Sequence, residues 1–181
     1  PIGCELTQSF ARFGSQVTQV EMAPRLMPRE DADAATEVMQ QFISEGITVA
    51  VAHKALRVEQ DGNGGVLVCE NEGKEVRFAF DKIVLALGRV ANTDGFGLKE
   101  LGITINQRGT IDANEWMQTN FPNIYVCGDA TGPYQFTHVA AHQAWYASVN
   151  ALLSPFWSFK VDYRIIPWAT FTDPEVARVG L

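Results

Sequence analysis

The stretch Asn123–Ala144, NIYVCGDATGPYQFTHVAAHQA, indicates the fold class of this chain. Its apolar run 124–127 predicts a buried strand, which ends at Gly128-Asp129, and a helical pattern starts after a Gly-Pro turn, near Thr137-His138. A strand, turn and helix in this order suit an open α/β sheet, in which ligands bind outside the carboxyl ends of the strands. The residues alone leave open whether Asp129 caps a turn or binds a ligand.

The composition indicates a soluble globular protein with no affinity for nucleic acid. The 181 residues are 46% hydrophobic and 19% charged, and they are enough for one or two domains. The formal net charge of −7 opposes attraction to nucleic acid and to anionic membranes. The sequence has no apolar run of the roughly 20 residues that a membrane helix needs.

Three cysteines, Cys4, Cys69 and Cys127, lie too far apart for a CxxC redox pair or a zinc knuckle. So sparse a set suits the reducing cytoplasm, where each cysteine is predicted to be a small buried apolar residue. We therefore expect a cytoplasmic protein.

The first fifty residues alternate between helical and strand patterns. Helices are predicted over 5–13 and 31–44, with strands ending near Glu21 and covering 47–51. This order is the middle of a βαβ alternation, whose parallel sheet needs a strand before residue 1. Because the chain also ends abruptly at DPEVARVGL, we expect it to be a piece of a longer one.

Three short alternating runs follow, ALRVEQ (55–60), GVLVCE (65–70) and EVRFAF (75–80). The turn-rich linkers DGNG and NEGK between them predict antiparallel hairpins. Next, DKIVLALGR (81–89) lacks alternation and predicts a strand buried on both faces. A loop then leads to the predicted strand at 124–127, a helix is predicted from His138 to Leu153, and 158–181 predicts strands of a separate element. Domain boundaries are expected near 104 and 157.

Gly3 and Glu21 have the spacing of the last glycine and the acidic residue of a dinucleotide-binding fold. That glycine allows close packing of helix and strand, and the acid accepts hydrogen bonds from ribose hydroxyls. The other two glycines of the fingerprint are absent. A helix-packing glycine and a surface glutamate are the alternative interpretation.

Two further groups are less specific. His138 and His142 are four residues apart and could share a metal, but no third ligand is evident, so packed or capping histidines are predicted and no metal site is expected. The charged residues after Glu21 predict a solvated loop, or else a site beside an adenosine ribose, where an arginine would bind a 2′-phosphate. They are Arg25, Arg29, Glu30, Asp31 and Asp33.

Taken together, five segments resemble the FAD-dependent pyridine nucleotide-disulfide oxidoreductases, the family of dihydrolipoamide dehydrogenase, glutathione reductase and mercuric reductase. They run through nearly the whole chain in family order, and the last segment and FTHVA look most like the mercuric reductase branch. The segments are PIGCEL, VTQVEMAPRLMPRED, DKIVLALGRVANTDGFGL, TNFPNIYVCGDATG with FTHVAAHQA, and IPWATFTDPEVARVGL.

The resemblance implies three domain parts in an α/β fold. Residues 1–104 would be most of a Rossmann-like NAD(P)-binding domain with a three-stranded antiparallel appendage. Residues 105–157 would be the returning half of an FAD domain, and 158–181 the start of an α+β interface domain. The intact enzyme is then expected to be a homodimer that uses NAD(P)H, FAD and an unidentified electron acceptor.

The resemblance also implies roles for individual residues. Glu5 would lie near the nicotinamide, and Glu21 would hold the adenosine ribose, which favours NAD over the alternative, NADP. Asp129 would bond the flavin ribityl chain or phosphates, and the N–H groups at His138 and Val139 would face the flavin ring, where a helix N-terminus stabilises negative charge. The implied cofactor-binding residues are Gly3, Glu5, Glu21, Gly88, Arg89, Gly128, Asp129, His138 and Val139.

None of the three cysteines matches the family's redox-active pair, and the C-terminal His-Glu base is also missing. No catalytic residue is therefore assigned, and the chain alone is expected to be inactive and to bind FAD poorly. Two other functions stay open: a flavoprotein that passes electrons to a quinone, oxygen or another nucleotide, and a nucleotide-binding module without chemistry.

Overall fold

The computed structural model describes residues 1–62 and 64–180 and divides them into two compact units. Unit 1 comprises Pro1–Leu87 and Ala169–Arg178, and unit 2 comprises Gly88–Trp168 with Val179 and Gly180. Asn63, in the predicted DGNG turn, and Leu181 lie outside the described residues. Within the described ranges, no helix has the length and apolar character needed to cross a bilayer.

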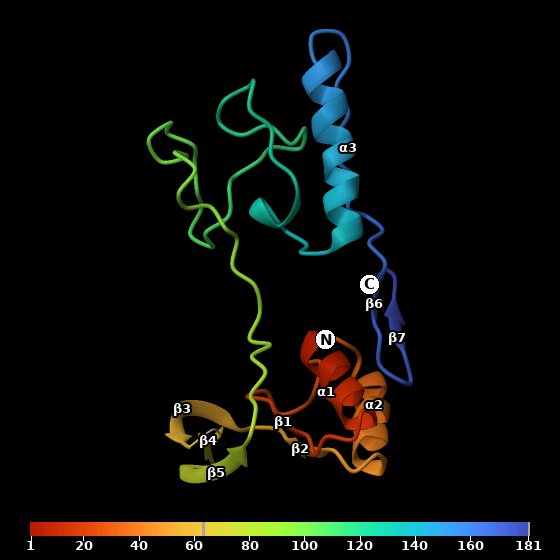
Figure 1. Ribbon diagram of the computed structural model, residues 1–181. Coiled ribbons are helices and arrows are strands. Elements are labelled where there is room, and N and C mark those ends of the chain that lie inside the picture. The colour runs from red at the N-terminus through yellow and green to blue at the C-terminus, as the bar shows by residue number, and fades with distance from the viewer. Residues whose placement is uncertain (63, 181) are drawn as a thin grey trace. The chain divides into compact units, whose positions relative to one another are not determined.

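Unit 1 begins with the predicted alternation of helices and strands (Figure 1). Its elements are α1 (Ile2–Arg12), β1 (Thr18–Val20), α2 (Ala32–Ser44) and β2 (Thr48–Ala50). β1 and β2 pair in parallel, as expected for a βαβ unit. Both helices pack on this pair through a buried cluster formed by Cys4, Leu26, Met27, Val38, Phe42 and Ile47.

The predicted hairpins form a three-stranded antiparallel sheet in unit 1. β3 (Lys54–Asp61), β4 (Gly64–Asn71) and β5 (Lys74–Phe80) pair in sequence order, with β4 in the centre. Val68 and Cys69 of β4 are fully buried. Glu72 and Gly73 both have positive φ, at 50° and 76°, as a tight hairpin turn between β4 and β5 requires.

The prediction of a doubly buried strand at 81–89 is wrong in this structure. Residues 82–89 form no strand, and the large apolar side chains among them are exposed, from 39% at Ile83 to 87% at Leu87. The reason is that β1 and β2 pair only with each other, so that no described strand is hydrogen-bonded to this segment. An apolar run forms a buried strand only where neighbouring strands supply hydrogen bonds and covering side chains.

Unit 2 consists largely of loops around one long helix, α3 (Thr137–Leu153), which confirms the predicted helix. The predicted buried strand at 124–127 is also wrong: only Tyr125 makes an isolated bridge, with Gln118, and Cys127 is exposed rather than buried. Gly128–Ala130 form a short 3-10 turn, η1.

Two short strands lie near the end of the chain, where strands were predicted. β6 (Trp168–Thr170) and β7 (Val176–Arg178) form a separate two-stranded sheet. Mixed parallel and antiparallel sheets with helices agree with the α/β class predicted from the sequence. The assignment of 1–104, 105–157 and 158–181 to three domains stays a prediction.

Candidate functional site

In unit 1 the carboxylate of Glu21 lies at the carboxyl end of β1. The backbone N–H of Glu21 donates to the carbonyl of Ala50 at 2.9 Å, and the backbone carbonyl of Glu21 accepts from the N–H of His53 at 3.0 Å. These two bonds extend the pairing with β2. The side-chain Oε1 of Glu21 accepts from the N–H of Ala23 at 2.7 Å. Glu21 is therefore fixed, half-buried, at the edge of a parallel pair where α/β folds bind ligands.

Gly3 and Glu5 lie in the first turn and a half of α1. A Cβ added at Gly3 would lie 3.5 Å from Cβ of Ala86 and 3.7 Å from Nε2 of Gln19, which are ordinary contact distances. Packing within this chain therefore does not require glycine there. The Glu5 carboxylate accepts a hydrogen bond at 2.9 Å from the N–H of Phe171, which lies next to the end of β6.

Arg25, in the charged loop after Glu21, donates hydrogen bonds to the main chain of that loop. The guanidinium of Arg25 donates to the carbonyl of Met27 at 3.2 Å and to that of Pro28 at 2.9 Å. Arg29 is exposed, whereas Glu30 is buried at 6% exposure, so the loop is only partly the solvated one predicted from the sequence. The guanidinium of Arg25 is thus hydrogen-bonded to backbone carbonyls of its own loop.

In unit 2 the structure brings Arg89 and Asp129 together. Nη1 of Arg89 donates to the carbonyl of Gln135 at 3.1 Å and lies 3.7 Å from Oδ2 of Asp129. Both side chains are about half exposed, so the pair is open to solvent or to a ligand. The preceding Gly88 has a φ of 111° with open space where a Cβ would lie, a conformation that favours glycine.

The N-terminus of α3 begins eight residues after Asp129. No side chain caps this helix end, so its first N–H groups have no partner from a capping side chain. Val139 is buried at 1% exposure, whereas His138 is exposed and its ring stacks on Phe136, with centroids 5.4 Å apart. The helix end can therefore present N–H donors and a partial positive charge to an anion or a polar ring edge.

Sequence reasoning missed Gln143, which holds the turn at Asp129 onto α3. This fully buried glutamine accepts from the N–H of Gly128 at 2.6 Å and donates at 2.7 Å both to the carbonyl of Gly132 and to the hydroxyl of Tyr163. Its partners span the whole turn 128–132. Gln143 and Asn150 are in helical phase with the buried Val139 and Ala147, and this phase is the signal that could have found them.

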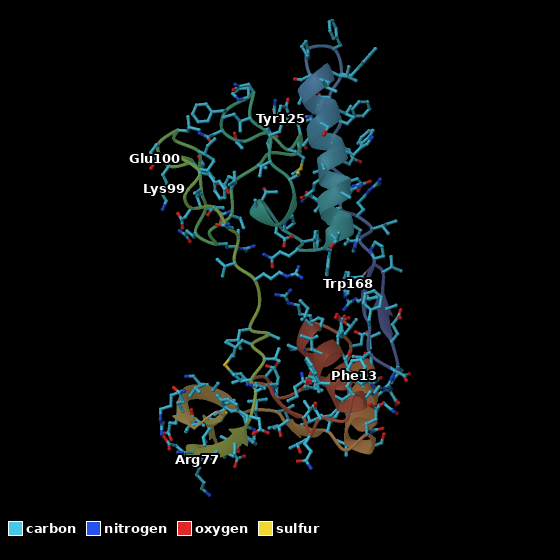
Figure 2. The ribbon with its side chains drawn as sticks, viewed as in Figure 1. Phe13, Arg77, Lys99, Glu100, Tyr125 and Trp168 are labelled. Atoms are coloured by element: carbon cyan, nitrogen blue, oxygen red, sulfur yellow. The ribbon has the colours of Figure 1, made fainter. Side chains whose placement is uncertain are left out.

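Asn150 plays a similar part further along α3. Its amide donates to the carbonyls of Trp116 and Phe159 and accepts from the N–H of Phe159. Tyr125 points toward α3 (Figure 2), and its hydroxyl donates to the carbonyl of Asn150 at 3.2 Å. The loops that lead into Gly128 are thereby tied to the helix that follows it.

The two histidines of α3 have separate partners. Nε2 of His142 lies 3.0 Å from the carbonyl oxygen of Asp162, while His138 stacks on Phe136. In the part of the chain that the structure describes, no three His, Cys, Asp or Glu side chains are grouped to hold a metal ion. These contacts agree with the predicted packing role of the pair.

The three cysteines are free thiols. Cys4 and Cys69 are buried as predicted, and burial raises the pKa of both thiols, which makes them poor nucleophiles. Cys127 is exposed, contrary to prediction.

Comparison with known proteins agrees with this arrangement. Residues 1–144 match the family model described as pyridine nucleotide-disulphide oxidoreductase. The chain belongs to this family. It is 35% identical to dihydrolipoyl dehydrogenases from Mycobacterium leprae and from Bacillus subtilis, over 99% of this chain and 38% of each relative. The chain therefore spans well under half the length of these curated relatives.

Two solved structures have a similar fold. The HOCl-induced flavoprotein disulfide reductase RclA from Escherichia coli matches with a TM-score of 0.85 at 29% identity. LpdA from Mycobacterium tuberculosis matches with a TM-score of 0.87 at 29% identity. Each match covers 99% of this chain, and 40% and 38% of those chains. The expected likeness to the mercuric reductase branch stays a prediction.

Proposed function

We propose that this chain is the central part of a flavoprotein oxidoreductase in which NADH reduces FAD, and FAD then reduces a redox disulfide and an acceptor. The chemistry of the two cofactors is transfer of a hydride from the nicotinamide to the flavin. Family membership supports the reaction class. The observation that carries the proposal is the fixed carboxylate of Glu21 at the carboxyl end of β1, in a parallel pair of the kind that binds dinucleotides.

The residues of unit 1 fit an adenosine ribose without a 2′-phosphate. Glu21 uses one side-chain oxygen on the N–H of Ala23, and a carboxylate has further acceptor positions for two ribose hydroxyls. Its negative charge would repel a 2′-phosphate. Arg25, which could attract one, is turned onto the carbonyls of Met27 and Pro28. We therefore expect NADH to be preferred over NADPH.

The residues of unit 2 fit a flavin with its ribityl chain. Asp129, half exposed beside Arg89, can accept from ribityl hydroxyls, and Arg89 can pair with a phosphate. The N-terminus of α3 would lie against the ring, where its N–H groups favour the negative charge that reduction brings. Gln143 would keep Gly128 and Asp129 in place for this contact.

The nucleotide preference can be tested on the full-length flavoprotein. Anaerobic titration should give tighter binding for NADH than for NADPH, and Glu21→Ala should weaken NADH binding by about tenfold through the lost charge-assisted hydrogen bonds. Glu37→Ala, which removes an exposed acid on α2, is the matched control. Preference for NADPH would contradict the assignment of Glu21 and direct attention to Arg25 and Arg29.

The flavin contact has a test of its own. Asp129→Ala in the full-length protein should release flavin on dialysis, while Asp94→Ala, which removes an exposed partner of Lys99, should retain it. Full flavin retention in Asp129→Ala would return this aspartate to a role in the turn alone.

A further inference from the structure

The turn 171–175 between β6 and β7 lies on one side of α1 within unit 1. Glu5, Gln8 and Arg12 follow one another at intervals of three and four residues, so they share a helix face. Glu5 accepts from the N–H of Phe171, and Arg12 donates to Oδ2 of Asp173 at 2.7 Å. Three consecutive positions of this face therefore contact the same turn.

Gln8 makes the central contact of this face. Its Oε1 accepts from the N–H of Asp173 at 2.7 Å, and its Nε2 donates to the carbonyl of the same residue at 2.8 Å. Gln8 is only 4% exposed, so its side of both hydrogen bonds is shielded from water. The amide thus pairs with the main chain of the turn as a neighbouring strand would.

Charged groups extend the contact to α2. Glu45 accepts hydrogen bonds from Arg12 at 2.6 Å, from Gln41 at 2.8 Å and from Gln8 at 3.0 Å. The Arg12 guanidinium is the main cause that lowers the pKa of Glu45 to about 2, so the cluster is charged at neutral pH. Val176, at the start of β7, packs on the buried cluster around Cys4 and Val38. Apolar and charged contacts together hold the turn on α1.

We propose that Gln8 and Arg12 are positioning residues for the nicotinamide end of the nucleotide site, acting on Glu5 through the turn 171–175. They hold Asp173, two residues after Phe171, and thereby keep the Phe171 N–H where it fixes the Glu5 carboxylate. The inference rests on the proposed function, and on the expectation from the family resemblance that Glu5 lies near the nicotinamide.

The chemical consequence concerns the orientation of one carboxylate. Phe171 occupies one acceptor position of Glu5 and leaves others for a ligand donor such as a carboxamide N–H. A carboxylate held in one rotamer contacts the nucleotide in one geometry, and a loosened one does not. Loss of the turn contacts should therefore slow hydride transfer more than it weakens adenosine binding, which depends on Glu21.

The experiment is stopped-flow reduction of the full-length flavoprotein by NADH. Gln8→Ala should lower the limiting rate of flavin reduction by about tenfold, because misplacement of a contacting group slows a bound reaction steeply. Asp173→Ala removes one ion pair, and Arg12→Ala removes the pairs with Asp173 and Glu45. Each should lower the rate by about threefold, because surface ion pairs are of small energy. Arg12→Lys should restore part of the loss because the charge pair is kept. Reduction by dithionite, which needs no nucleotide site, should be unchanged in all four variants.

Two controls separate positioning from loss of structure. Arg77→Ala removes an exposed ion pair with Glu59 in the same unit, away from the turn, and should leave the rate unchanged. In a Glu5→Ala background, Gln8→Ala should add little further loss, because both substitutions act on the same contact. If Gln8→Ala does not retain flavin, Asp173→Ala replaces it in the comparison with wild type. The Asp173 side chain is 71% exposed, so its removal should not disturb folding.

The outcomes distinguish the two proposals. Normal NADH reduction in folded Gln8→Ala and Asp173→Ala variants would overturn the positioning role and leave the proposed function intact. If Gln8→Ala lowered the rate of flavin reduction by a further tenfold in the Glu5→Ala background, the positioning role would also be overturned, because Gln8 would then act independently of Glu5. A wild-type protein whose flavin NADH does not reduce would overturn the proposed function, and the positioning role with it.

Discussion

Unit 1 and unit 2 each fix a turn to a helix through one buried glutamine, but the surroundings of the two glutamines differ. Gln8 of α1 holds the main chain of Asp173, and Arg12, Glu45 and the Asp173 carboxylate surround this contact. Gln143 of α3 holds Gly128 and Gly132 at opposite ends of one turn, and the neutral hydroxyl of Tyr163 is its other partner.

The difference follows from the cost of burying charge. Asp173 and Arg12 stay 71% and 47% exposed, so their charges keep most of their hydration. Around the fully buried Gln143, a charged partner would lose its hydration and cost several kcal/mol, whereas amide, carbonyl and hydroxyl groups satisfy one another. The contact in unit 1 should therefore respond to pH and salt, and the contact in unit 2 to truncation of a side chain.

The largest effect is expected for Gln143→Ala. The substitution leaves the buried N–H of Gly128 and the carbonyl of Gly132 without this partner, which should lower the free energy of local opening by about 3 kcal/mol. Hydrogen exchange at the Gly128 amide should then accelerate by roughly a hundredfold. Ser148→Ala on the exposed side of α3 is the control, and equal protection in both variants would contradict the role of Gln143.

The two candidate-site glycines should differ in their tolerance of alanine. Gly128 has a φ of 76°, and a Cβ there would lie 3.4 Å from Cβ of Ala140, so Gly128→Ala should destabilise unit 2 by about 1–2 kcal/mol. Gly3 lies in a helix with room for a Cβ, so Gly3→Ala should stabilise unit 1 by up to about 1 kcal/mol. Hydrogen exchange measured at increasing urea concentrations would give the stability of each unit. A similar loss of stability in both units would contradict this contrast.

Acid should weaken the contact in unit 1 selectively. The pKa of Glu45 falls from its ordinary 4.5 to about 2 in the folded chain, chiefly because Arg12 donates to it. A depressed folded pKa gives stability that is present above pH 4.5 and is lost as the pH falls from 4.5 to 2. Protection of the Asp173 amide should decrease across this window, and Glu45→Gln should remove the dependence.

Salt should have the smallest effect, and again in unit 1. Raising NaCl to about 1 M screens the exposed pairs of Arg12 with Glu45 and Asp173, which are worth less than about 1 kcal/mol. Exchange at the Asp173 amide should rise by a few-fold, whereas exchange at the Gly128 amide should not change. A larger response at Gly128 would show that the contact at Gln143 depends on charge after all.

Local patterns predicted the helices and hairpins of this chain because periodicity and turn residues act over a few positions. The same reasoning failed at Ile83–Leu87 and at 124–127, where burial depends on strands elsewhere. It named Arg89 and Asp129 separately without showing that they meet. The contact of Gln8 with Asp173 joins residues 165 positions apart, and no local pattern marks it.

Cys127 is an exposed free thiol that a reagent can modify. The other two thiols, Cys4 and Cys69, are buried in unit 1, whereas Cys127 lies in unit 2 directly before Gly128. A maleimide reagent should therefore label unit 2 alone in the folded chain. A fluorophore attached at this position would report on the turn at Asp129 without any substitution in the sequence.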